Sequence, residues 1–352
     1  MSEALQIKLD EEAQPLRPGG VVRGAVLVAA EASWCDVELT LVFVAAVLDH
    51  EVALTLERER LAGLPERGRR PFTLPIPAAK RPFAGERLTL RLELRAEASP
   101  FEAPAAPVAA TPCQLAIEPD PAERLHLVLP QEASADYRGV RRRLFALAAG
   151  PLGLAGLCAL GGAAGLGGLY VVAVLVGGLG VGLGAGAWGR YREICDAPRF
   201  FAVSAERVAE GSYRTAVRGE RLYVQLDYGA KVALRGAKAI LEVREGVEVS
   251  PSWDRALLGG GDRVRTTLPL AHVQTLYSHE LELAPRGAAG HYEGLLDVPS
   301  GREQPPPSFT LRHDQARFKA TIAWVLVLET ELSDGGRWRY ELSIHAQPPG
   351  GI

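Results

Sequence analysis

The chain is poor in the residues that build metal and thiol chemistry. Its 352 residues include only seven histidines and four cysteines, Cys35, Cys113, Cys158 and Cys195. No two cysteines have the C-x-x-C spacing of a zinc or redox site, and none lies near a histidine cluster. We therefore predict no metal site, no cofactor and no disulfide framework, and we expect thiols that stay reduced in a reducing compartment.

Catalytic signatures are also missing. The sequence contains no H-E-x-x-H, G-x-S-x-G or G-x-x-x-x-G-K-[ST] pattern. Asp49-His50-Glu51 and Ser278-His279-Glu280 place polar groups beside a histidine, but strand neighbours point to opposite faces and cannot form a dyad. The glycine-rich residues 259–262 lack the lysine of a phosphate loop. We predict no catalytic residues, and a membrane-bound hydrolase with an atypical site stays as an alternative.

The charge balance argues against a nucleic-acid partner. The formal net charge is −3, and the arginines and lysines are scattered rather than gathered in a stripe. One denser group is interspersed with glutamates and predicts a loop that either contacts anionic lipid or is simply solvated. It consists of Arg58, Arg60, Arg67, Arg69 and Arg70. The first residues lack the basic and apolar pattern of a signal segment, so we expect the first domain to stay in the cytoplasm.

Charge is wholly absent from one long apolar stretch, residues 144–188. A single helix of this length would be about twice as long as the hydrocarbon core of a bilayer requires, whereas two helices of about 20 residues fit. We predict membrane spans at about 144–163 and 168–188, joined by a glycine-rich turn. The alternative is a glycine-rich pair of core helices inside a large soluble domain.

Arginines flank this stretch at both ends, and we predict that they anchor it at the membrane surface. They are Arg141, Arg142 and Arg143 before it, and Arg190 and Arg192 after it. Because the positive-inside rule places such flanks in the cytoplasm, we expect two spans with both soluble domains cytoplasmic, in a bacterial inner membrane. The lipid bilayer is then one partner of the protein, and a further protein partner is expected but not identified.

Small residues within the second span suggest how the two helices pack. Gly178, Gly182 and Gly186 recur every four residues, a spacing that lets two helix backbones approach closely. We predict that this stripe is the helix-packing surface of the hairpin. Tyr137, Trp188 and Tyr191 are expected to form an aromatic belt at the cytoplasmic interface.

Alternation of apolar and polar residues predicts strands on both sides of the apolar stretch. Leucines occupy positions 88, 90, 92 and 94, and residues 318–328 and 338–344 alternate around a turn at 333–336. We predict an all-β protein with β-sandwich domains at 1–118 and 196–352, plus a connector and basic membrane-entry segment at 119–143. Trp324 shares a strand face with Ile322, Leu326 and Leu328, so we predict that it anchors the core of the second domain.

The two halves also share an order of motifs. Each opens with a glycine-marked strand, PGGVVRG at 18–24 and VRGERL at 217–222. Each later has a proline-containing approach to an alternating strand: FTLP at 72–75 leads to FAGERL at 83–88, and PPPSF at 305–309 leads to FKATIAW at 318–324. This order resembles the arrestin-like fold, a tandem of β-sandwiches, over roughly residues 4–118 and 196–347. A pair of unrelated immunoglobulin-like sandwiches is the alternative.

The resemblance implies a non-enzymatic scaffold or adaptor that binds protein clients along strand edges and sheet faces. Two departures limit what it carries over: arrestin-type adaptors have no transmembrane hairpin between their domains, and this sequence has no P-P-x-Y motif. The charged latch of the family does not map onto these residues, so receptor or phosphate sensing is not carried over. An accessory subunit of a membrane transport or envelope complex is the alternative function.

Overall fold

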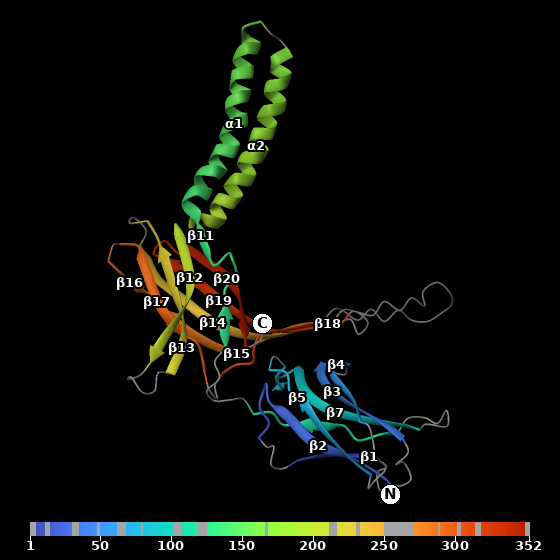
Figure 1. Ribbon diagram of the computed structural model, residues 1–352. Helices are drawn as coiled ribbons and strands as arrows, with labels where there is room; N and C mark the ends of the chain where they lie inside the picture. The colour runs from blue at the N-terminus through green and yellow to red at the C-terminus, as the bar shows by residue number, and fades with distance from the viewer. Residues whose placement is uncertain are drawn as a thin grey trace.

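A computed structural model describes most of the chain, with gaps between the described segments. These are residues 5–10, 15–29, 35–47, 50–61, 68–78, 80–100, 108–118, 125–165, 168–210, 217–229, 233–249, 270–287, 289–300, 304–313 and 318–348. They form antiparallel sheets before and after a pair of long helices (Figure 1). The predicted fold class, an all-β protein with a helical hairpin between two sheet-rich regions, is confirmed.

The first half of the chain folds into two antiparallel sheets. One has the strand order β1-β2-β5, and the other has β4-β3-β7-β6, with β8 and β9 also paired to β7. The strands are β1 (Leu5–Leu9), β2 (Val21–Val28), β3 (Cys35–Val47), β4 (His50–Leu61), β5 (Arg69–Pro75), β6 (Phe83–Ala84), β7 (Leu88–Pro100), β8 (Val108–Ala109) and β9 (Cys113–Leu115). The alternating leucines of β7 are buried in the core, as the period of two requires.

The second half builds two larger sheets. A six-stranded sheet has the order β10-β20-β19-β14-β15, with β18 also paired to β19, and a five-stranded sheet has the order β11-β12-β13-β17-β16. Their strands are β10 (His126–Val128), β11 (Ser134–Asp136), β12 (Phe200–Glu210), β13 (Val217–Asp227), β14 (Leu234–Val249), β15 (Leu270–Glu282), β16 (Ala284–Pro285), β17 (His291–Asp297), β18 (Phe309–His313), β19 (Phe318–Leu332) and β20 (Arg337–Gln347). Trp324 is completely buried with its predicted neighbours on β19, so its placement as a core anchor is confirmed.

The described part of the predicted connector is not a linker. Residues 126–128 form β10 and pair with β20, and residues 134–136 form β11 and pair with β12. Both strands therefore belong to the sheets of the second sandwich, although they precede the helices in the chain. The connector prediction is wrong here because strands of three residues are too short to show an alternating pattern in the sequence.

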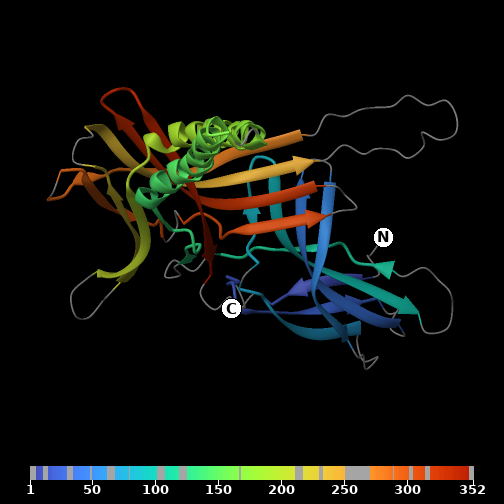
Figure 2. The same cartoon turned by 90° about the horizontal axis from the view of Figure 1, so that it is seen from above.

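Two helices are inserted between β11 and β12 of the second sandwich and project from it (Figure 1). They are α1 (Tyr137–Ala163) and α2 (Gly168–Cys195). Their turn-proximal ends match the predicted spans, whereas their other ends run on to residues 137 and 195. Both are long and apolar enough to cross a membrane. Of the most apolar 18 residues of each helix, 0% are buried in α1 and 6% in α2. Viewed from above, the hairpin lies over the second sandwich, and the first sandwich lies to one side (Figure 2).

The predicted glycine stripe is not the contact between the two helices. A β-carbon built on Gly180 would lie 3.0 Å from the Leu152 side chain, and one built on Gly177 would lie 3.6 Å from Ala155. The predicted Gly178, Gly182 and Gly186 have nothing within 4 Å of that position. The helix is rotated relative to the prediction, so that Gly177 and Gly180, which are three residues apart, face α1.

Candidate functional site

The start of α1 is fixed to the second sandwich. The Asp136 side chain, at the end of β11, accepts a hydrogen bond of 2.9 Å from the backbone N–H of Arg138 and caps the helix. The Arg138 guanidinium forms an ion pair with Asp227 at the end of β13. The backbone N–H of Tyr137 donates to the carbonyl of Arg199 at 2.8 Å. The hairpin therefore continues directly from a sheet strand and does not hang on a flexible linker.

A second attachment joins α1 to the end of α2. The Arg141 guanidinium donates to the backbone carbonyls of Ile194, Cys195 and Ala197 at 3.0, 3.1 and 2.9 Å. The last carbonyls of a helix lack partners within that helix, and its dipole favours a positive charge at this end. Arg141 thus holds the two helix ends together. Its predicted role as a membrane-anchor flank stays a prediction, and these three carbonyls are partners that the sequence did not indicate.

Aromatic rings fill the junction beneath the helices. The ring of Tyr137 lies 6.3 Å from that of Phe201 and 6.4 Å from that of Trp338, and Phe201 also packs 4.9 Å from Tyr340. Tyr137 therefore packs at the edge of the sandwich core, and its membership of an interfacial belt stays a prediction. The other two predicted belt residues are adjacent on α2, because Trp188 stacks on Tyr191 with 5.7 Å between ring centres.

The two sandwiches meet at a buried carboxylate. Glu245, on β14, is completely buried and accepts hydrogen bonds from three consecutive backbone N–H groups of the first sandwich. The donors are Glu86, Arg87 and Leu88, at 3.2, 2.9 and 2.8 Å. A β-carbon on Gly85 would lie 1.9 Å from a carboxylate oxygen of Glu245, so only glycine leaves room for this contact. The contact supplies the hydrogen bonds that a buried charge requires.

Apolar and cationic groups extend the interdomain contact. Phe43 of β3 meets Phe309 of β18 edge to face, with 5.8 Å between ring centres. The ammonium group of Lys80 lies 5.4 Å from the first ring centre and 6.0 Å from the second, within reach of a cation–π attraction. Ring packing and a shared cation therefore reinforce the Glu245 contact and fix the relative position of the two sandwiches.

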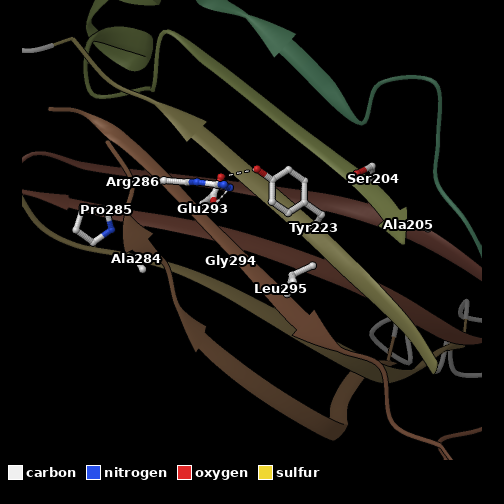
Figure 3. Close-up of a pocket in the computed structure, with 9 residues that line it drawn as sticks. All are labelled: Ser204, Ala205, Tyr223, Ala284, Pro285, Arg286, Glu293, Gly294 and Leu295. Carbon is white, nitrogen blue, oxygen red and sulfur yellow. Dashed lines mark hydrogen bonds and ion pairs between the residues drawn. The ribbon is translucent and has the colours of Figure 1, made fainter. Parts of the chain in front are cut away.

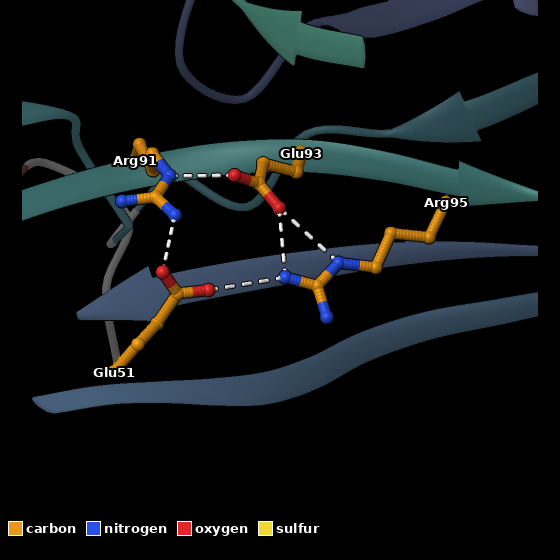
Figure 4. Close-up of polar contacts among 4 residues, drawn as sticks. All are labelled: Glu51, Arg91, Glu93 and Arg95. Atoms are coloured by element: carbon orange, nitrogen blue, oxygen red, sulfur yellow. Dashed lines mark hydrogen bonds and ion pairs between the residues drawn. The ribbon is translucent and has the colours of Figure 1, made fainter. Parts of the chain in front are cut away.

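An arginine–glutamate cluster covers the outer face of the first sandwich (Figure 4). Arg91 donates to Glu93 at 2.5 Å and to Glu51 at 2.6 Å, and Arg95 donates to Glu93 at 2.8 Å. Burial raises the pKa of Glu93, but the hydrogen bonds from Arg91 and Arg95 outweigh it and lower the pKa overall. Val42, the β3 partner of Glu93, is buried on this face. The cluster therefore covers this part of the sheet with charged groups.

The second sandwich repeats the arrangement. The Arg244 guanidinium donates to both carboxylate oxygens of Glu341 at 3.0 Å, and Arg339 donates to the same carboxylate at 2.9 Å. Val325 and Val327 are buried on the same sheet face. The hydrogen bonds from Arg244 and then Arg339 lower the pKa of Glu341 to about 2.

A shallow groove of about 790 Å³ opens on the five-stranded sheet (Figure 3). The Tyr223 hydroxyl donates to the Glu293 carboxylate at 2.5 Å, and the same carboxylate forms an ion pair with Arg286. This hydrogen bond, followed by burial, raises the pKa of Tyr223, and it lowers the pKa of Glu293. Leu295 and the small residues Ser204 and Ala205 complete the lining, so the groove combines polar groups with an exposed apolar side chain.

The remaining sequence candidates are dispersed. Arg58 and Arg60 lie on β4 and each pairs with an acidic residue of β3, while Arg70 is buried and donates to a backbone carbonyl at 3.2 Å. They do not form the predicted loop, and the first sandwich lies away from the hairpin (Figure 1). Residues 62–67, 48–49 and 259–262 lie outside the described residues. Within the described segments, no group of three or more His, Cys, Asp or Glu residues could hold a metal ion.

Comparisons with known proteins add little to this geometry. No family model and no curated protein matches the chain. Among solved structures, Spo0M, a sporulation control protein from Bacillus subtilis, matches at 12% identity and a TM-score of 0.25, covering 78% of this chain and 91% of that one. The α-2-macroglobulin of E. coli matches at 13% identity and a TM-score of 0.23, covering 97% of this chain and 16% of that one. Both TM-scores are too low to establish a shared fold.

Proposed function

We propose that this protein is a non-enzymatic, membrane-anchored scaffold of arrestin-like build, with both sandwiches on the cytoplasmic face. The observation that carries the proposal is the exposure of the hairpin. Large apolar side chains such as Leu157, Leu160 and Val174 are 68%, 70% and 74% exposed. Water disfavours so large a contiguous apolar surface, whereas lipid tails accommodate it. The soluble alternative, a core helix pair, needs buried helices, and these are not.

The dimensions of the hairpin support the same proposal. Residues 144–163 and 168–188 carry no charge, and each segment of this length spans roughly 30 Å, the thickness of a hydrocarbon core. Two spans return the chain to the side on which it started. Both sandwiches lie on the side of the hairpin opposite its turn, the second at its base and the first beyond the second (Figure 1). The arginines at this base favour the cytoplasmic side.

The scaffold role rests on surfaces that suit protein clients. The groove at Tyr223 and Glu293 offers hydrogen-bonding groups beside the exposed Leu295, a combination common at protein interfaces. The hydrogen-bonded junction at Arg138 and Arg141 would hold such a surface at a fixed distance from the bilayer. We assign no enzymatic activity, because the sequence offers no nucleophile and base in a workable arrangement.

Cysteine labelling in intact cells tests the topology. In a background with the four native cysteines replaced, we would introduce Arg60→Cys in the first sandwich, Arg337→Cys in the second and Tyr170→Cys near the helical turn. An impermeant thiol reagent should label only Tyr170→Cys, and the other two should react after permeabilisation. Labelling of one sandwich in intact cells would mean a single span, and labelling of both but not of Tyr170→Cys would reverse the orientation.

An accessory subunit of a larger membrane complex is the second candidate function. The observation in its favour is the outward stripe of Gly178, Gly182 and Gly186, which leaves space for another transmembrane helix. Affinity capture from detergent-solubilised membranes separates the two functions. A stable membrane complex of fixed stoichiometry would favour the subunit, and transient soluble clients would favour the scaffold.

A further inference from the structure

The base of the hairpin carries arginines of two kinds. Arg138 is engaged by an ion pair, and Arg141 by three backbone carbonyls. The others are exposed, and within the described residues none of their guanidinium groups forms an ion pair or hydrogen bond. We name these others the basic collar, and they are Arg142, Arg143, Arg190 and Arg192.

The helix contacts place the collar at a single level. Gly180 faces Leu152, and Gly162 faces Tyr170, so each step along α1 toward the base is matched by one step along α2. The same antiparallel register, continued to the base, brings Arg142 level with Arg190. At about 1.5 Å per residue, Arg143 lies on the turn side of this level and Arg192 on the base side, each within about 3 Å of it along the helix axis.

The collar also surrounds the hairpin. Successive residues of a helix point about 100° apart, so Arg142 and Arg143 leave α1 in different directions, as do Arg190 and Arg192 on α2. On the turn side of the collar lies Trp188, exposed and stacked on Tyr191, and beyond it the uncharged segment begins. Cation, indole and apolar side chains thus follow one another in the order of headgroup, interface and hydrocarbon.

We propose that the basic collar binds the headgroups of anionic phospholipids. The planar guanidinium group donates two parallel hydrogen bonds to a phosphate and keeps its charge at any physiological pH. Four such groups at one depth match a ring of lipid phosphates around the hairpin. The inference rests on the proposed membrane insertion and adds to it the class of lipid that is selected. Each arginine should raise the affinity for an anionic lipid about fivefold, the equivalent of about 1 kcal/mol per charge.

Native mass spectrometry of the full-length protein in mild detergent tests this proposal. Offered equal amounts of phosphatidylglycerol and phosphatidylcholine, the wild type should retain the anionic lipid preferentially. The fourfold variant Arg142→Gln/Arg143→Gln/Arg190→Gln/Arg192→Gln should lose this preference by at least roughly 25-fold, the loss expected if two of the four arginines contact each lipid at about fivefold per charge. The matched control, Arg58→Gln/Arg60→Gln/Arg235→Gln/Arg337→Gln, removes the same charge from exposed sites on the sandwiches. It should retain the preference for the anionic lipid.

Three outcomes would overturn the proposal that the basic collar binds anionic lipid. They are equal retention of both lipids by the wild type, an unchanged preference in the fourfold variant, and a loss of preference in the control as large as in the variant. Competition by millimolar inorganic phosphate that removes all bound lipid would also overturn it, because the site would then take a free anion. Alkaline washing of membranes separates the two proposals. Release of the wild type would refute insertion, whereas retained protein without lipid preference would refute the collar alone.

Discussion

At the scale of single residues, Trp324 shows how a strand pattern translates into stability. Its ring is completely buried, and its indole N–H donates to the carbonyl of Pro306 at 2.9 Å. Trp324→Ala should cost roughly 3–5 kcal/mol, because it leaves a cavity and removes the partner of a carbonyl. The thermal midpoint of the full-length protein in detergent should fall by on the order of 10 °C. The midpoint should fall less in Trp324→Phe. An unchanged midpoint for the alanine variant would place the residue outside the core.

Glu341 makes a prediction about pH. Its pKa is lowered from 4.5 to about 2 by hydrogen bonds from Arg244 and then Arg339. A carboxyl with a lowered folded pKa stabilises the protein above its unfolded pKa and loses that contribution as the pH falls toward the folded value. Because 43% of the side chain is exposed, solvent screening limits the contribution to about 1 kcal/mol or less. Glu341→Gln should unfold at a lower temperature than wild type at pH 7, and the gap should close near pH 2. A gap that does not change with pH would mean that the carboxylate charge plays no part.

The residues that the sequence could predict are those whose partners lie near them in the chain. Trp324 is recognisable because its neighbours two residues away are apolar. Glu245 is not, because its three donors lie 157 to 159 residues away and nothing near it in the chain marks a charge for burial. The partners of Arg141 were not predictable either. Sequence spacing places this residue at a membrane boundary but does not show which carbonyls it reaches.

At the scale of elements, long periodic segments were predictable and short ones were not. The uncharged stretch predicted both helices, since its length admits two spans and its glycines mark the turn. The rotation of α2 depends on which of several glycine rows packs best against α1, and the sequence offers rows at both three- and four-residue spacing. Short strands such as β10 and β11 form because β20 and β12 provide partners, so tertiary pairing decides them.

Two substitutions on α2 test the helix contact directly. Gly180→Leu should separate the helices, because even a β-carbon would lie 3.0 Å from Leu152. We expect a loss of roughly 1–2 kcal/mol of helix association, measured as a lower thermal midpoint in detergent. Gly182→Leu is the matched control, since it changes helix propensity equally and meets nothing within 4 Å. If Gly182→Leu were the destabilising variant, the outward face of α2 would be the packed one.

At the scale of the whole molecule, one carboxylate controls how the sandwiches are arranged. Glu245→Ala would leave three backbone N–H groups at the interface without this acceptor, and each hydrogen bond to a charged group contributes about 1.5–3 kcal/mol. Because each sandwich has its own pair of hydrogen-bonded sheets, we expect the interface to open while both domains stay folded.

Spin labels measure this opening. With labels at Arg60→Cys and Arg337→Cys, the full-length protein should show one narrow interdomain distance, and Glu245→Ala should broaden and lengthen it. Gly85→Ala should act in the same direction, because its β-carbon would displace the carboxylate from the other side of the interface. Glu248→Ala, on an exposed site of the same strand, is the control and should keep the narrow distance. An equally narrow distance in Glu245→Ala would mean that the other interdomain contacts, such as those of Phe43, Phe309 and Lys80, are enough to hold the sandwiches together.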